Sequence, residues 1–544
     1  MSDDAKQPDV LVVGGGSVGL TAAMMLAEQG LTVQVLERQA ASSIHPRAGG
    51  LGPRTMEIFR QFGLADRVRA AGDPPDAGIG RVRADTLVAA DIADRPRVAA
   101  TAIGDASKAY SPEGGVACAQ DRLDAVLLDA VRARGVRITY GCTVRELRPC
   151  RDCPGVTVVV EETGTGAMRT LTARDVLAAD GASSGMRRHL GLNTNGPGPV
   201  GPRMLNVLFR ADLRALVCKP GGQPGPMMVQ ITHPESPGLL VSSGVADRWT
   251  FHISDAPADV TPERARVLIG LAIGQSDIAI DILSMLPWTP AAQVAERFRR
   301  DDIFLMGDAA HVVPPLGAFG LNLGIADPHN LAWKLALVRR GLAGASLLDT
   351  YDVERRAAAQ FTVDHALARI RNPELHFDHL HLESPAFRAA RERLGVAHAL
   401  IVHLGYRYAS SAIIGSTPDL PSLEDPARAW DGAPGSRLPH AWIARPGATH
   451  STLDLVRHRF TLIAGPQATR TCLEASAAAS RRHLPLDVHQ DVDVDWLTSI
   501  GLDADGALLV RPDAFIAWRQ VSQPGGRIAS DDLLDRVLHR PVTV

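Results

Sequence analysis

The chain has 544 residues, of which 45% are hydrophobic, and its formal net charge at pH 7 is −3. A chain of this length is too long to fold around a single hydrophobic core, so we expect two or three domains. The near-neutral charge does not indicate a nucleic-acid partner, and no apolar run is long enough to predict a membrane span. The acidic residues 1–4 do not begin a signal peptide, and six cysteines over this length do not predict a disulfide framework. We therefore expect a cytoplasmic globular protein with reduced thiols.

A glycine-rich turn follows the first apolar run, residues 10–13. Its spacing is G-x-G-x-x-G, and its glycines are Gly14, Gly16 and Gly19. Residues 20–29 then have the pattern of a helix, and a second expected strand, residues 32–36, ends at Glu37. Strand, turn, helix and carboxylate in this order are typical of a dinucleotide-binding site, with the carboxylate on a ribose hydroxyl. Glu37 favours an adenosine with a free 2′-hydroxyl, as in FAD or NAD.

A second anion site is predicted between residues 303 and 335. The apolar residues 303–306 read as a buried strand, and Gly307-Asp308 follows them. A loop rich in glycine and proline then leads into residues with helical spacing after Gly320. Free backbone N–H groups and the positive end of the helix dipole point at any ligand held there.

These motifs resemble those of the class A flavoprotein monooxygenases, which are aromatic hydroxylases of the p-hydroxybenzoate hydroxylase fold. Three motifs occur in family order: the glycine-rich turn, Asp180-Gly181 and Gly307-Asp308. The resemblance covers roughly the first 370 residues. It is greatest to the longer members, the dichlorophenol-type phenol hydroxylases and polyketide hydroxylases, which carry an extra C-terminal domain.

The resemblance implies noncovalent FAD, NADPH or NADH as reductant, and O2 as co-substrate. The cofactor-binding residues that it implies are Gly14, Gly16, Val18, Gly19, Glu37, Arg38, Gln120, Asp180, Asp308, Gly320, Leu321 and Asn322. It places Arg47 beside the mobile flavin and Pro315 in the loop that positions it, and it indicates no metal site and no acid or base. Gly49 stands where yeast-type phenol hydroxylases carry a catalytic Asp, and Ser183 where Arg is common, so neither role is carried over.

Residues 193–290 have a different sequence pattern from the rest of the chain: short runs of residues typical of β-strands alternate with turns rich in proline and glycine. In the family, a sheet in this region covers the flavin and forms the substrate chamber. The chamber candidates are Met227, Met228, Trp249, Phe251 and His252. Because side chains alternate along a strand, about half of such residues must point away from the chamber.

The expected fold class is α/β, with a Rossmann-like FAD-binding domain, an interleaved β-rich substrate domain and a thioredoxin-like C-terminal domain. The FAD-binding domain is assigned to residues 1–80, 108–192 and 291–370, the substrate domain to 81–107 and 193–290, a helical linker to 371–420, and the C-terminal domain to 421–544. Cys472 is the only cysteine after residue 421, so this domain has no C-x-x-C redox motif. Cys150 and Cys153 do form such a spacing, but flanking prolines place them in a hairpin loop with a structural role.

The resemblance predicts hydroxylation of a phenolic or aromatic polyketide substrate through a flavin C4a-hydroperoxide. One alternative is a Baeyer–Villiger oxygenase acting on a polyketide ketone; another is a binding module that kept only the nucleotide fold. A flavin halogenase is disfavoured, because Trp288-Thr289-Pro290 does not match its Trp-x-Trp-x-Ile-Pro motif. The expected partner is a small aromatic or polycyclic molecule, and a homodimer is compatible with the resemblance.

Overall fold

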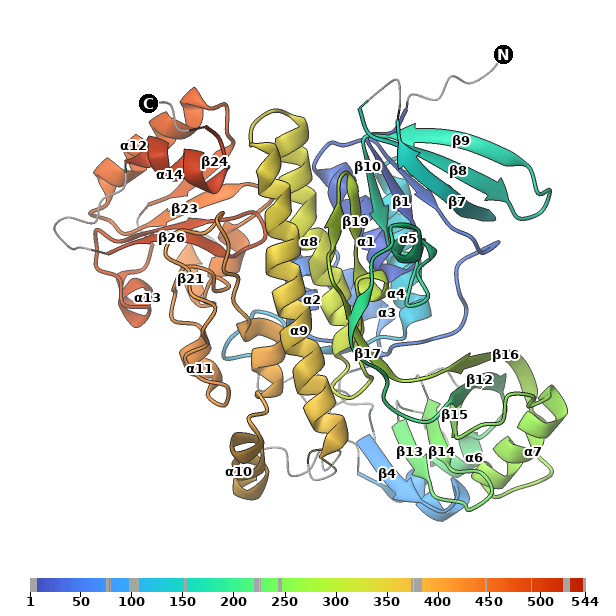
Figure 1. Ribbon diagram of the computed structural model, residues 1–544. Helices are drawn as coiled ribbons and strands as arrows, with labels where there is room; N and C mark the ends of the chain where they lie inside the picture. Colours follow the sequence, from blue (N-terminus) through green and yellow to red (C-terminus); the bar gives the residue numbers. More distant parts are fainter. Residues whose placement is uncertain are drawn as a thin grey trace.

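The structure is a computed structural model. It describes residues 7–74, 78, 80–96, 107–150, 154–219, 225, 227–242, 247–372, 375, 384–445, 448–490, 492–521 and 529–541. Figure 1 shows three regions: a C-terminal layer on the left, beyond two long helices; a central α/β layer at the upper right; and a mostly antiparallel sheet below that layer.

The central sheet has six strands in the order β18-β19-β10-β1-β2-β6. Its strands are β1 (Val10–Val13), β2 (Val33–Leu36), β6 (Arg137–Thr139), β10 (Asp175–Ala178), β18 (Arg299–Arg300) and β19 (Ile303–Leu305). All pairs are parallel except β18 with β19. Every residue of β1, β2, β10 and β19 is buried, as expected for a sheet covered on both faces.

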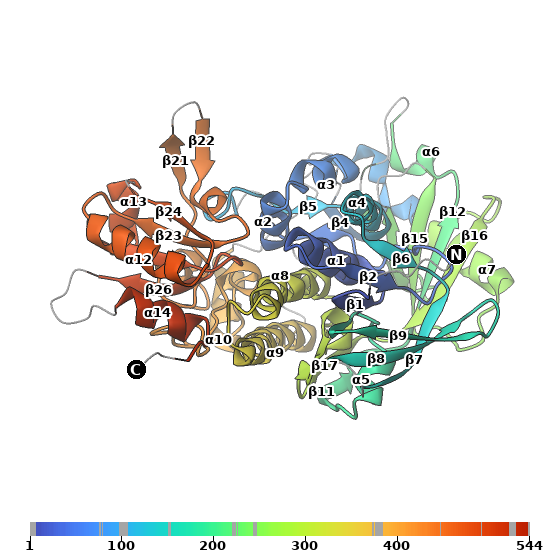
Figure 2. The same cartoon turned by 90° about the horizontal axis from the view of Figure 1, so that it is seen from above.

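Two long helices separate this sheet from the C-terminal layer (Figures 1 and 2). They are α8 (Phe319–Arg339) and α9 (Asp349–Arg371). Nearly all of α8 after Leu321 is buried, because it contacts α1 on one side and α9 on another. The other helices of the central layer are α1 (Ser17–Glu28), α2 (Pro53–Gln61), α3 (Ala65–Ala71), α4 (Gln120–Ala133) and α5 (Gly185–His189).

Smaller sheets attach to the central layer. Their strands are β3 (Gly50–Leu51) with β5 (Val116–Ala117); β7 (Cys142–Pro149), β8 (Val156–Glu162) and β9 (Met168–Ala173); and β11 (Thr194–Pro199), β17 (Ala291–Ala295) and β20 (His311–Val312). The chain turns between β6 and β7 at Gly141, which has φ +65°.

The hairpin between β7 and β8 contains Cys150, as expected, with its N–H bonded to the carbonyl oxygen of Gly155 at 2.9 Å. Cys150 is disulfide-bonded, so the expectation of reduced thiols throughout is wrong at this position. The other half of the C-x-x-C spacing, Cys153, lies outside the described residues.

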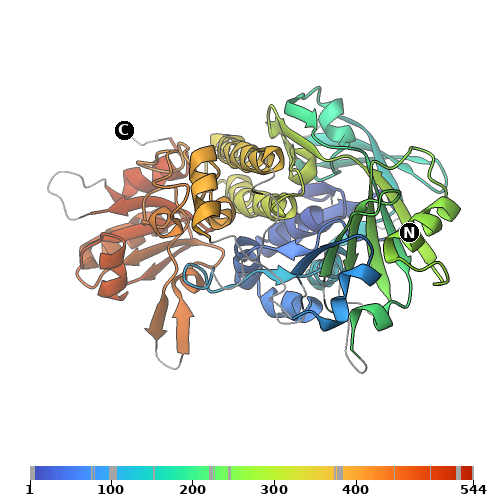
Figure 3. The same ribbon diagram turned by 90° about the horizontal axis from the view of Figure 1, so that it is seen from below.

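A second sheet lies beneath the central layer in Figure 1, and Figure 3 shows the molecule from that side. The order of its strands is β16-β12-β15-β14-β13-β4. Its strands are β4 (Gly80–Ala84), β12 (Met204–Arg210), β13 (Met227–Ile231), β14 (Gly238–Ser242), β15 (Arg248–Ser254) and β16 (Asp281–Trp288). One face packs against α7 (Pro262–Ile273) and the short α6 (Arg214–Val217) in a separate hydrophobic core. The strand β4, from far earlier in the chain, closes one edge of this sheet.

The C-terminal layer contains a four-stranded sheet in the order β24-β23-β25-β26. Its elements are β23 (Phe460–Ala464), α12 (Thr469–Arg481), β24 (Leu486–His489), α13 (Val494–Ser499), β25 (Ala507–Val510), β26 (Ile516–Gln520) and α14 (Ser530–Val537). The first two strands are parallel and joined by a helix, whereas β25 runs antiparallel to both β23 and β26.

The segment between α9 and this sheet contains α10 (Pro385–Leu394), α11 (Pro426–Ala429), β21 (Trp442–Arg445) and β22 (Ala448–Ser451). Residues around Ile401 pack on Phe319 and Ala366, so the segment is part of the folded body. None of the described helices combines the length and apolar character needed to cross a membrane.

Candidate active site

The glycine-rich turn between β1 and α1 is shaped by close backbone contacts. Gly14 has φ +112°, and a side chain there would collide with the carbonyl oxygen of Ala179. A side chain at Gly19 would collide with the carbonyl oxygen of Gly14. A Cβ at Gly16 would meet nothing within 4 Å, so the space in front of this residue is open. An open backbone surface at a helix N-terminus fits a pyrophosphate.

Glu37 closes the same turn from the end of β2. Its carboxylate accepts hydrogen bonds from the N–H of Gly15 at 2.6 Å and of Gln39 at 2.8 Å. Glu37 is half-buried and keeps lone pairs for a ligand hydroxyl. The side chain of Arg38 is exposed.

The Gly307-Asp308 turn packs directly on this region. Gly307 has φ +57°, and a Cβ on it would lie 3.0 Å from Cγ2 of Val18. Val18 thus joins α1 to the Gly307-Asp308 turn through packing. The carboxylate of Asp308 has no hydrogen-bond partner among the described residues, and its side chain is reachable by solvent.

We infer from two observations that Asp308 lies in a cleft: its side chain is exposed to solvent, and the surrounding protein still desolvates it. Burial raises the pKa of Asp308, while the charges of His311 and Arg47 partly oppose that rise. A side chain that is both open to solvent and desolvated by dense surrounding protein lies in a concavity. An unpartnered carboxylate there fits a ribityl hydroxyl of FAD, because such an anion only accepts hydrogen bonds.

Sequence reasoning missed the residue that holds this turn, Asp327 of α8. Its buried carboxylate accepts from the N–H of Gly307 at 2.8 Å, from Nε2 of His311 at 2.8 Å and from Nε of Arg355 at 2.7 Å. Burial opposes ionisation, but the charges of His311 and Arg355 lower the pKa of Asp327. The hydrogen bond to Asp327 fixes the ring of His311 inside the protein. An acidic residue within an otherwise apolar helix was the available signal.

The Asp180 motif meets the Gly307-Asp308 turn through Arg187. Asp180 accepts hydrogen bonds from Ser184 Oγ at 2.5 Å and from the N–H of Met186 at 3.0 Å. Arg187 donates to the carbonyl oxygens of Ala182 and Ala309, at 3.0 and 2.8 Å. These contacts bring the second and third motifs together.

The loop before α8 carries a strained residue. Ala318, which precedes the helix, has φ +55°, a conformation that a residue with Cβ rarely adopts. No side chain caps the helix start, so the N–H groups near Gly320 and Leu321 stay available. Pro315 is exposed on this loop.

The side chain of Asn322 bonds within the protein and is not available for a contact with the cofactor. Its Oδ1 accepts from the N–H of Gly52 at 2.7 Å and from Thr55 Oγ1 at 2.6 Å. Its Nδ2 donates to the carbonyl oxygens of Gly50 at 3.1 Å and Ala318 at 2.7 Å. All four hydrogen-bonding positions of the amide are used, so only the backbone of Asn322 remains free for a ligand.

The loop that includes Arg47 borders the cleft. Arg47 is exposed, and its charge acts on both Asp308 and Asp124. Gln120 begins α4 and donates its N–H to the carbonyl oxygen of Ala48 at 2.9 Å. The two predicted residues therefore lie on adjoining segments.

Asp124, also missed from sequence, lies one turn further along α4 and accepts a short hydrogen bond from Ser17 Oγ. Burial raises the pKa of Asp124 to about 6, and the hydrogen bond from Ser17 opposes the rise. This pair joins α4 to the start of α1.

The strands of the lower sheet decide which chamber candidates are correct. Met227, Trp249 and Phe251 are at most 2% exposed and lie in the core against α6 and α7. Trp249 donates its Nε1–H to the carbonyl oxygen of Ala211 at 3.1 Å, inside that core. We therefore exclude these three from the chamber. Met228 and His252 alternate with them on the opposite face and are only partly buried.

That opposite face meets the nucleotide-binding layer. Arg248 of β15 pairs with Asp121 of α4 at 2.9 Å and donates to the carbonyl oxygen of Ile44 at 2.8 Å. The sheet, the loop before Arg47 and α4 thus surround one region, with the Asp308 cleft beside it. Among the described residues, no group of three or more His, Cys, Asp or Glu could hold a metal ion.

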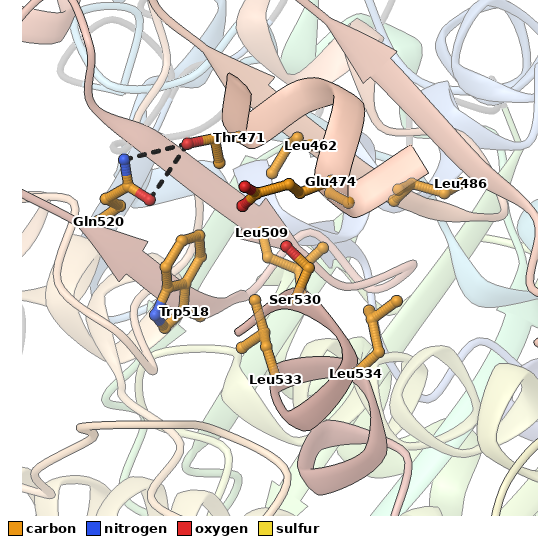
Figure 4. Close-up of a pocket in the computed structure, with 11 residues that line it drawn as sticks. Leu462, Thr471, Glu474, Leu486, Leu509, Trp518, Gln520, Ser530, Leu533 and Leu534 are labelled. Atoms are coloured by element: carbon orange, nitrogen blue, oxygen red, sulfur yellow. Dashed lines mark hydrogen bonds between the residues drawn. The ribbon is translucent and has the colours of Figure 1, made fainter. Parts of the chain in front are cut away.

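A second hollow, in the C-terminal layer, does not form part of this site (Figure 4). It is lined mainly by leucines of β23, β24, β25 and α14, together with Trp518. Its polar side chains Thr471 and Gln520 hydrogen-bond to each other at 3.2–3.3 Å. Glu474 and Ser530 also line the hollow, and Glu474 accepts a hydrogen bond from Nε of Arg470 at 2.6 Å.

The thiol of Cys472 in this layer offers a direct test of redox function. Cys472 lies on α12, is 6% exposed and is the only cysteine after residue 421. We expect Cys472→Ala to keep its turnover per bound flavin within about twofold, because a single thiol cannot form a disulfide within its domain. Steady-state assays normalised to flavin content measure this. A large loss of turnover in a folded, flavin-loaded variant would contradict a purely structural role.

Together, the fold and the cleft define a flavin-dependent monooxygenase. The family model described as "FAD binding domain" matches residues 7–366, and that described as "Aromatic-ring hydroxylase, C-terminal" matches residues 431–541. The chain belongs to the FAD-binding aromatic-ring hydroxylase family.

Several relatives match over nearly the full length. Tetracenomycin A2 monooxygenase-dioxygenase from Streptomyces glaucescens is 35% identical, with 98% of this chain and 97% of the relative covered. Aklavinone 12-hydroxylase from Streptomyces purpurascens is 34% identical, covering 94% and 95%. The crystal structure of aklavinone-11 hydroxylase with FAD and aklavinone superposes with a TM-score of 0.83 at 32% identity, covering 99% of this chain and 100% of that one.

Proposed function

We propose that this protein hydroxylates a phenolic or polycyclic aromatic polyketide substrate, using FAD, NADPH or NADH, and O2. The proposal rests mainly on one face of the lower sheet. This face is partly exposed, carries Met228 and His252, and lies opposite the segment that contains Arg47. A flat apolar substrate fits between such a face and a flavin. The relative that holds FAD and aklavinone has the same fold over the whole chain, which supports this substrate class.

The residues divide into three proposed roles. Gly14, Gly16 and Gly19, with Val18 behind them, shape the pyrophosphate site, and Glu37 with Arg38 contacts the adenosine ribose. Asp180, Asp308 and Gln120 face the ribityl and pyrophosphate region, while the backbones of Gly320, Leu321 and Asn322 point at the isoalloxazine ring. Arg47 and Pro315 position the flavin.

Bound FAD supplies the electron transfer and oxygen activation for the reaction. This chain contributes binding and exclusion of water. The uncapped start of α8 favours negative charge beside it, because its N–H groups and dipole point outward. The apolar residues Met228, Leu239, Val241 and Leu286 line the partly exposed face and limit water near the reacting atoms.

We also propose a domain division for the chain. The FAD-binding domain comprises residues 1–80, 108–203 and 291–370. The strand β11 pairs with β17, which in turn pairs with β20, and this favours moving the expected boundary from residue 192 to residue 203. The substrate domain comprises residues 81–107 and 204–290. The order β24-β23-β25-β26 with its helices supports a thioredoxin-like C-terminal domain without C-x-x-C.

Substrate-dependent consumption of the reductant tests the proposed function. We expect NADPH or NADH oxidation by the flavin-loaded protein to rise at least about tenfold with an accepted aromatic compound, since waste of reductant is avoided when flavin reduction awaits substrate. Aklavinone, 1-naphthol and phenol are suitable aromatic probes, and cyclohexanol is the matched non-aromatic control. Peroxide release and product mass are measured in the same reactions.

The products discriminate between the alternatives. A product one oxygen heavier with intact rings supports hydroxylation, whereas ring opening or expansion to a lactone supports the Baeyer–Villiger reaction. If no aromatic compound or ketone accelerates oxidation, and flavin is reduced equally fast without one, the proposed function is wrong.

A further inference from the structure

Four polar side chains gather where the lower sheet meets the nucleotide-binding layer. They are His45, Asn206, His252 and Trp288, and we call them the polar cluster. Asn206 of β12 is the direct cross-strand neighbour of His252 on β15. The rings of His252 and Trp288 lie edge to face, with centroids 6.3 Å apart.

The polar cluster lies on the face of the sheet that is turned away from the second core. Val207 and Phe251, the chain neighbours of Asn206 and His252, are fully buried in that core. Because strand residues alternate, Asn206 and His252 must point to the other side. Trp288 joins them there, since it pairs with Met204, two residues before Asn206.

His45 reaches this face from the loop that leads to Arg47. The hydrogen bond from Arg248 to the carbonyl oxygen of Ile44, 2.8 Å long, fixes the preceding residue on the sheet. The side chain of His45 is 3% exposed. Its charge contributes to lowering the pKa of His252, so the two rings lie near each other. Burial lowers the pKa of His45 and that of His252, the latter to about 4, so both rings are neutral near pH 7.

The buried polar atoms of the cluster lack partners. Both ring nitrogens of His45, Oδ1 of Asn206 and Nε1 of Trp288 have no hydrogen-bond partner among the described residues. His45 and Asn206 are close enough to interact, yet their geometry does not make a hydrogen bond. Unpaired buried polar atoms are costly and few in native proteins, so a partner from outside the chain is expected here.

The chemistry of these atoms selects the kind of partner. Trp288 only donates, the free amide oxygen of Asn206 only accepts, and a neutral imidazole does one of each. This set matches an oxygen that both donates and accepts, such as a phenolic hydroxyl, or one that accepts, such as a quinone carbonyl. The surroundings also suit an aromatic ring, because Met228, Leu239, Val241 and Leu286 lie partly exposed on the same face.

We propose that His45, Asn206 and Trp288 form a subsite that binds a hydroxyl or carbonyl oxygen of the aromatic substrate, with the partly exposed His252 at its open side. This inference rests on the proposed function and deepens it. The subsite fixes how an oxygenated ring is oriented on the sheet, and so which carbon faces the flavin.

The test compares two ligands that differ by one hydroxyl, 1-naphthol and naphthalene. Their dissociation constants are measured from the absorption change of the flavin in the FAD-loaded protein. We expect the wild-type protein to bind 1-naphthol at least about tenfold more tightly, because a paired buried polar group is worth roughly that factor. In Asn206→Leu and in His45→Phe this preference should fall below about threefold, while naphthalene binding and FAD content stay unchanged.

A matched control is His233→Ala, in the turn between β13 and β14 of the same sheet, which should keep the full preference. The subsite is refuted if the wild-type protein does not distinguish the two ligands, or if both cluster variants keep the wild-type preference. Failure of the proposed function is a separate result, since it requires that no aromatic compound accelerates reductant oxidation in the wild-type protein.

Discussion

Glu354→Gln is expected to lower the free energy of unfolding by about 3–5 kcal/mol, because it leaves buried positive charge without its partner. Glu354 of α9 is completely buried and pairs with Lys334 of α8 at 2.8 Å. It also accepts two hydrogen bonds from Arg511, at 2.6 and 2.8 Å, and Arg511 in turn pairs with Asp513. The two positive charges, on Lys334 and Arg511, thus neutralise the two negative charges, on Glu354 and Asp513, where α8, α9 and the C-terminal layer meet.

The pH dependence follows from the same network. Burial opposes ionisation of Glu354, but the charges of Arg511 and Lys334 outweigh it and hold the pKa of Glu354 well below its usual range. A carboxylate with a depressed pKa contributes stability above its unfolded pKa, which is 4.5 for Glu354, and that contribution is lost as the pH falls. The wild-type protein should therefore lose stability below about pH 4.5 more steeply than Glu354→Gln.

Urea unfolding followed by tryptophan fluorescence measures this, since Trp333 lies beside Arg511 at 5.2 Å. Asp364→Asn, an exposed acid-to-amide change on the same helix, is the matched control. The double variant Lys334→Met/Glu354→Met should recover part of the loss, because Arg511 and Asp513 still pair and no buried charge is left over. A single variant as stable as the wild type would show that the network contributes little.

Asp308→Ala is expected to weaken FAD binding roughly 10- to 150-fold, the worth of a hydrogen bond to a charged group. The carboxylate is the accessible, unpartnered acceptor in the cleft, so its removal takes away a ligand contact without breaking a contact within the described protein. Titration of the apoprotein with FAD, followed by flavin fluorescence, gives the dissociation constant.

Asp301→Asn provides the matched control for Asp308. Asp301 is exposed with φ +54°, a conformation that asparagine tolerates, and it lies at the start of the same strand region. The control should bind FAD like the wild-type protein. If Asp308→Ala binds FAD within about twofold of the wild type, the assignment of the third motif is wrong.

The sequence by itself determined the local elements of the nucleotide site. The turn at Gly14–Gly19, the strand before Gly307 and the helix after it were predicted close to their observed bounds. Such features depend on residues adjacent in the chain: periodicity, glycine spacing and the end of a strand.

Only the tertiary structure decided which side of each strand faces the chamber. Because side chains alternate along β15, those of Trp249 and His252 must point to opposite faces of the sheet. Both faces are covered by other elements, so the sequence alone does not say which face is turned toward the nucleotide-binding layer. The contact between Arg248 and Asp121, 127 residues away, shows which face meets the nucleotide-binding layer.

The same holds for the polar residues that hold the site together. Asp327 meets Gly307 twenty residues away, and Glu354 meets Arg511 across 157 residues. An acid within an apolar helix pattern can be noticed in the sequence, as at Asp327, but the pattern does not say which residue pairs with it. Long-range pairing is fixed when the layers pack, since a buried charge is tolerated only where a partner from another element meets it.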